Sequence, residues 1–115
     1  MAFTEAQQQQ QIRRATEYFL EQKRPPEEIR SQLDIACSIE GQSVFIFEIR
    51  PNMRLMELRE TPIAKATFVK AHNHWKIFWM RGDLKWHPYT AELTVKSIAS
   101  FFEVVMKDDY CCFFG

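Results

Sequence analysis

The chain has few glycines and cysteines, no long hydrophobic run, and no net charge over its 115 residues. Its three glycines are too scattered to form a glycine-rich loop that binds phosphate groups. Three cysteines cannot supply the paired framework of a small secreted domain. No apolar stretch reaches membrane-spanning length, and the N-terminus lacks a leader-like pattern. We therefore expect a cytoplasmic protein with no membrane partner.

The composition fits one globular domain over residues 1–115. Hydrophobic residues make up 46% of the chain, and ten Phe and three Trp supply large side chains for a core. Fifteen basic and fifteen acidic residues balance overall, but residues 50–87 contain eight basic and only three acidic side chains. The local excess favours an anionic partner for one surface, whereas the neutral total argues against a general polyanion binder.

Helical periodicity marks both ends of the chain. Thr4 opens a capping-box pattern, and apolar residues then recur at helical spacing. Pro25 ends this helix, and Pro26 predicts the first turn of a second, short helix. Near the C-terminus, Thr94 is the expected N-cap of a last helix. The following tail, residues 110–115, is so apolar that we expect it to dock on the domain.

Between the helices the hydrophobic period is two, which predicts strands. Residues 33–40 and 44–50 suit a hairpin around Gly41-Gln42, Pro51 stops its second strand, and residues 52–60 are predicted to be a loop. Further strands are expected over residues 63–70, 75–81 and 84–89. The predicted fold class is α+β, an antiparallel sheet of four or five strands in a meander with the N-terminal and C-terminal helices packed on one face.

Six short segments spread along the chain form a distinctive set: residues 39–44, 46–51, 64–67, 75–81, 83–87 and 112–115. Together they resemble a bacterial family known as domain of unknown function 3024, and the resemblance covers nearly the whole chain. Cys111 stands where that family commonly has Gly, so no role for paired cysteines follows. The resemblance implies a compact single-domain protein, and it does not indicate what the protein does.

The outward side of the sheet is the predicted binding surface. We expect Phe45, Phe47 and Ile49 to face the helices, which would turn Glu48 and Arg50 outward. The candidate ligand-binding residues on this side are Arg50, Lys65, Lys76, Lys85, His87 and Tyr89. Sheet faces that mix cations with rings can hold phosphates while bases stack, although lysine and arginine stems also cover rings on ordinary solvated faces. The leading hypothesis is a non-catalytic binding module for an anionic ligand such as nucleic acid.

Two other functions stay open. Asp83-Leu84-Lys85 is the acid-x-Lys arrangement of some metal-dependent nucleases, in which Glu48 could add a second carboxylate for Mg²⁺. The same triplet also suits an ordinary turn after Gly82. The other alternative is a protein-protein interaction domain acting as a homodimer, paired by an edge strand or by Phe113-Phe114. The leading hypothesis assigns no catalytic residue, metal or cofactor.

Overall fold

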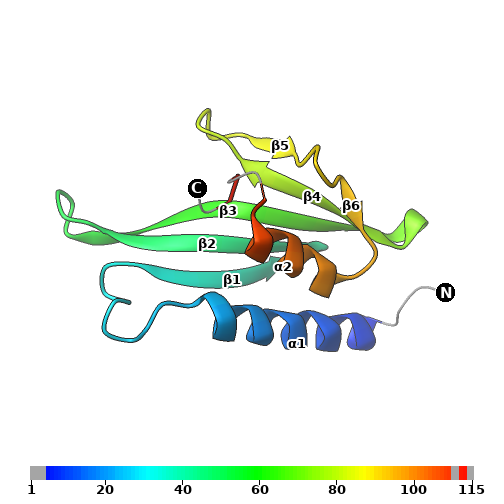
Figure 1. Cartoon of the computed structure of the whole chain (residues 1–115), viewed down its shortest axis with the longest axis horizontal. Helices are drawn as coiled ribbons and strands as arrows, with labels where there is room; N and C mark the ends of the chain where they lie inside the picture. Colours follow the sequence, from blue (N-terminus) through cyan, green and yellow to red (C-terminus); the bar gives the residue numbers. More distant parts are fainter. Residues whose placement is uncertain (1–4, 110–111, 114–115) are drawn as a thin grey trace.

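The structure, a computed structural model, describes residues 5–109 and 112–113 (Figure 1). Its two helices lie at the two ends of the chain and its strands lie between them. The elements are α1 (Glu5–Lys23), β1 (Asp34–Glu40), β2 (Ser43–Asn52), β3 (Glu57–Val69), the short 3-10 turn η1 (Lys70–His72), β4 (His74–Met80), β5 (Trp86–Pro88), β6 (Thr94–Val95) and α2 (Ile98–Lys107).

The strands form one antiparallel sheet in the order β1-β2-β3-β4-β5, and β6 pairs with β4. Both helices lie on the same side of this sheet, where α2 packs on β3, β4 and β6 and α1 packs against α2 and β1 (Figure 1). The predicted α+β meander with terminal helices is therefore confirmed. None of the described helices combines the length and apolar character needed to cross a membrane.

The core lies between the helices and one face of the sheet. Val44 and Ile46 of β2 are 1% and 0% exposed, whereas Phe45 and Phe47 between them are only half-buried. Because side chains alternate along a strand, Phe45, Phe47 and Ile49 point away from the helices. The expectation that these three residues face the helices was wrong by one residue. Both sets are apolar at the start of β2, and Glu48 and Arg50 further along the inner set made that set look like the outer one.

A hairpin arm replaces the loop predicted over residues 52–60. β2 continues through Pro51 to Asn52, and β3 already begins at Glu57. Pro51 is tolerated because β1 ends its pairing opposite Ile49, so this part of β2 has a free edge where no N–H is needed. The arm is the end of the β2–β3 hairpin that projects at the left of Figure 1.

Two local predictions were wrong. Residues 27–32 form hydrogen-bonded turns, not a second helix, with the Ile29 N–H bonded to the Pro26 carbonyl at 2.9 Å. Ser97, not Thr94, caps α2, because the Ser97 hydroxyl accepts a hydrogen bond from the Ser100 N–H at 3.1 Å. Thr94 instead lies in β6.

The chain ends contain both described and undescribed residues. Phe113 is buried and its ring lies 4.9 Å from that of Tyr89, as a docked tail requires. The predicted cap Thr4 and the tail residues Tyr110, Cys111, Phe114 and Gly115 lie outside the described residues.

Candidate binding surface on the uncovered face of the sheet

The sheet face opposite the helices carries a cluster of rings around one lysine. The register places Lys65 of β3 between Phe45 of β2 and Phe78 of β4, and Trp86 of β5 stands beside Met80. Phe47 follows two residues after Phe45 on the same face. We call the surface made by Phe45, Phe47, Lys65, Phe78 and Trp86 the aromatic face. All five of its residues are half-buried.

The aromatic face is held together by ring contacts and by the Lys65 ammonium. The ring of Phe45 lies 6.1 Å from that of Phe47 and 6.0 Å from that of Trp86. Lys65 Nζ lies 4.7 Å from the ring centroid of Phe78 and 4.9 Å from that of Trp86, which are cation-π distances. Partial burial lowers the pKa of Lys65. An anionic group brought to this partly dehydrated cation would interact with it more strongly than in bulk water.

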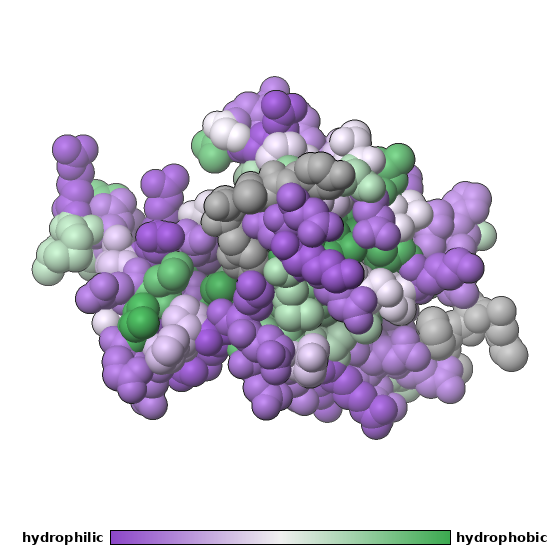
Figure 2. Space-filling model, in the orientation of Figure 1, coloured by the Kyte–Doolittle hydropathy of each residue, from purple (hydrophilic) through white to green (hydrophobic). Residues whose placement is uncertain are grey.

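The aromatic face continues onto the hairpin arm. Ile49, Pro51, Leu58 and Pro62 share its side of the sheet, since Pro62 is opposite Phe47 and Leu58 is opposite Pro51. The exposed fractions of the large apolar side chains of the arm are high: Met53 78%, Leu55 60%, Met56 87% and Leu58 67%. The helix side of the molecule is mostly hydrophilic, with a pale green tip at the arm (Figure 2). Apolar side chains therefore follow the uncovered face from β5 to the arm.

Two of the six predicted ligand-binding residues lie on this face. Lys65 is at its centre, and Lys76 points to the same side because its cross-strand partner is Thr67. Tyr89 is only 4% exposed and packs on Phe113 behind the sheet.

The other three predicted residues lie elsewhere. His87 is the cross-strand partner of Trp79, so it points to the helix side, where its Nε2 lies 2.8 Å from Asp83 Oδ2. Arg50 also points to the helix side and forms an ion pair with Glu48. Lys85 is exposed in the turn before β5. The predicted surface is divided because Trp86 and Pro88, not His87, face outward in β5.

The predicted nuclease residues are held by other partners. Glu48 forms an ion pair with Arg50. The Asp83 carboxylate accepts a hydrogen bond from the Lys85 N–H at 3.0 Å and shares a second hydrogen bond with Nε2 of His87. The His87 hydrogen bond lowers the pKa of Asp83. Over residues 5–109 and 112–113, no group of three or more His, Cys, Asp and Glu side chains could hold a metal ion. Asp83 thus closes the turn after Met80 and is not brought to Glu48.

Sequence reasoning missed three of the four rings of this surface, although it expected Phe78 to face outward. Phe45 and Phe47 were assigned to the core, and Trp86 was not considered as a surface residue. The available signal was that β2 is apolar on both faces at its start, over residues 44–47. A strand of that kind either is covered on both sides or presents apolar side chains on an open face.

Comparison with known proteins gives a family and no activity. The family model described as "Domain of unknown function (DUF3024)" matches residues 3–115. A search of curated proteins found no match, and neither did a search of solved structures. Because the family model spans nearly the whole chain, the protein belongs to the DUF3024 family.

Proposed function

We propose that this protein is a non-catalytic interaction module that forms a homodimer through its aromatic face. The observation that carries the proposal is the position of both helices on one side of the sheet, which leaves the rings of Phe45, Phe47, Phe78 and Trp86 half-exposed on the other. Extended apolar surface of this kind on one face is typical of protein interfaces, whose centres are rich in aromatic residues.

The hairpin arm is suited to contact a partner through its side chains and not through its strand edges. The edge of β2 is free beyond Ile49, and that of β3 is free before Ala64. Pro51 and Pro62 lie in these two free stretches, and neither can donate a backbone hydrogen bond to an added strand. A two-stranded ribbon is also only marginally stable alone. The exposed apolar side chains of the arm are therefore better explained by a covering surface.

The charges on the uncovered face of the sheet favour a second copy of the chain as the partner that covers it. A register shift at Ile46 and Phe47 lets Glu60, Pro62 and Lys65 point to the same side of β3. Glu60 and Lys65 then lie on opposite sides of Pro62. A two-fold axis near Pro62 would reverse the strand direction in the second copy and bring Lys65 opposite Glu60 of that copy, twice per dimer. Two such sheets would pack about 10 Å apart.

A charge swap tests the arrangement. We expect sedimentation equilibrium to give a dimer for the unmodified chain. Lys65→Glu and Glu60→Lys should each raise the dimer dissociation constant at least about tenfold, because close interfacial charge pairs are worth about 1.5 kcal/mol or more. The double variant restores opposite charges and should return the dissociation constant to within a few-fold of the original.

Arg14→Glu is the matched control, since Arg14 is exposed on α1, away from the aromatic face. It should leave the dimer unchanged. Circular dichroism on every variant separates lost association from lost folding. A monomer at the highest attainable concentration would refute the homodimer, and a double variant as weak as its parents would refute the predicted pairing.

Single-stranded nucleic acid is the second candidate for the same face. Lys65 and Lys76 are diagonal neighbours on adjacent strands, beside the ring of Phe78. This spacing suits phosphates of one strand while bases stack on the rings. The test is a fluorescence anisotropy titration with labelled oligonucleotides at two salt concentrations. Binding that weakens with salt and in both Lys65→Ala and Lys76→Ala supports it. Absence of binding at low salt rejects it.

A further inference from the structure

A hollow of about 310 Å³ lies at the other end of the sheet from the arm. Its walls come from the first half of α1, the turn between β1 and β2, and the connection between β3 and β4. The volume is at the lower end of the range for small-molecule sites. The hollow lies on the helix side and includes no residue of the aromatic face.

The floor of the hollow is apolar and fixed. Val44, Phe68 and Trp75 line it, with exposed fractions of 1%, 6% and 4%. The rings of Phe68 and Trp75 lie 5.1 Å apart and are tilted by 54°. Buried rings in contact hold their positions, so they give a preformed surface for the apolar body of a ligand.

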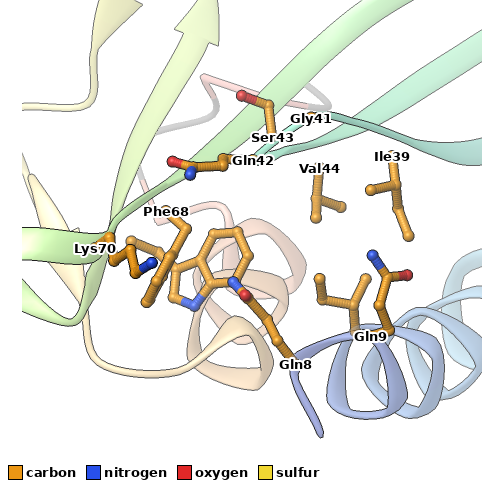
Figure 3. A pocket seen from close by; sticks show the side chains of 11 residues that line it. Gln8, Gln9, Ile39, Gly41, Gln42, Ser43, Val44, Phe68 and Lys70 are labelled. Carbon is orange, nitrogen blue, oxygen red and sulfur yellow. The ribbon is translucent and has the colours of Figure 1, made fainter. Parts of the chain in front are cut away.

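The rim of the hollow is polar. Gln8 and Gln9 rise from α1 on one side, and Gln42 and Lys70 lie across the opening from them (Figure 3). Among the described residues that line the hollow, Lys70 is the one with a charged side chain, and none of them is acidic. Within the described part of the chain, neither the Lys70 ammonium nor these three carboxamides has a hydrogen-bond or ion-pair partner.

We infer that this hollow binds a small organic monocarboxylate with an aromatic or branched apolar body. Its carboxylate would accept a charge-assisted hydrogen bond from Lys70 and neutral ones from the glutamine carboxamides. The body of the ligand would rest on Phe68 and Trp75. One cation, with no acidic side chain among the described lining residues, suits a single negative charge and disfavours a cationic ligand. The inference does not depend on the homodimer, because the two sites share no residue.

Phenylacetate is a suitable probe, with neutral phenylacetamide as its matched control. Two-dimensional ¹H–¹⁵N NMR detects the side-chain amides of Gln8, Gln9 and Gln42 and the Trp75 indole, so it reports directly on rim and floor. We expect saturable shifts concentrated on these signals. Phenylacetamide should bind at least about tenfold more weakly, because the charge-assisted hydrogen bond is lost.

Two lysine variants complete the test. Lys70→Gln keeps a polar side chain of similar reach and should weaken phenylacetate binding at least about tenfold. Lys107→Gln, at the end of α2, removes the same charge elsewhere and should leave binding unchanged. The inference is overturned if phenylacetate gives no saturable shifts, if Lys70→Gln binds it as well as the original chain, or if the shifts lie on Trp86 and not Trp75. Lys65→Glu should still bind the probe, so failure of the homodimer is seen separately.

Discussion

The contact between the two helices allows a quantitative prediction. Phe19 of α1 stacks on Phe102 of α2 with ring centroids 4.9 Å apart and an angle of 28° between the planes. Both side chains are fully buried, at 0% and 1% exposure. Truncating either side chain to alanine would lower the free energy of unfolding by about 3–5 kcal/mol. That is a large share of the roughly 5–15 kcal/mol by which a typical domain is stable. Leucine is the better substitution because it keeps apolar volume while it removes the ring.

We expect Phe19→Leu and Phe102→Leu each to lower the free energy of unfolding by about 1–3 kcal/mol, measured by urea denaturation. The double variant should lose less than the sum of the two, by about 0.5–1.5 kcal/mol, because the ring-ring contact can be lost only once. Losses that add within error would refute a specific ring contact. None of the three variants should change the dimer dissociation constant, since both residues lie on the helix side.

Three further predictions concern the thiol, the acid stability and the arm. Burial raises the pKa of Cys37 to about 12, so iodoacetamide at pH 8 should modify Cys37 only after unfolding, as mass spectrometry of native and denatured protein would show. The Arg24 guanidinium bonded to Asp34 lowers the pKa of that carboxyl, so its stabilisation is complete above the unfolded pKa of about 3.9 and is lost as the pH falls through the folded value. Asp34→Asn should therefore unfold at a midpoint that depends less on pH below about 4, and an unchanged acid dependence would contradict the pair. Leu58→Lys should weaken the dimer while changing the free energy of unfolding by no more than about 0.5 kcal/mol, because Leu58 is exposed in the monomer.

The meander could be predicted because each change of hydrophobic period falls at a turn residue. The period changes to two at Leu33, directly after the turns of residues 27–32, and Gly41, whose φ is +58°, turns the first hairpin. The arm could not be predicted in the same way. Proline at position 51 ordinarily ends a strand, and only the early end of β1 makes it harmless here. Where β1 ends depends on how neighbouring strands pair, and the sequence around Pro51 does not show it.

The outward orientation of Lys65 was predicted correctly and that of Phe45 was not, and both outcomes depend on polarity along the strand. In β3, small or apolar Ala64, Ala66 and Phe68 alternate with Lys65 and Thr67, so polarity alone shows which side is buried. In β2 both alternating sets begin with apolar residues, and the polar Glu48 and Arg50 then follow in the buried set of Val44 and Ile46, so polarity indicated the wrong side. β5 has only three residues, too few to establish an alternation, which is why His87 was placed on the wrong side.

The alternation along β3 also keeps the two proposed sites separable. Lys65 points to the aromatic face, whereas Phe68 points to the helix side and forms part of the floor of the hollow. Substituting Lys65 therefore leaves the packing of Phe68 in place, although both residues belong to the same strand. Lys70 lies beyond the end of β3, outside the ladder. A variant at either lysine that impaired both dimer formation and phenylacetate binding would mean that the sheet itself had been disturbed.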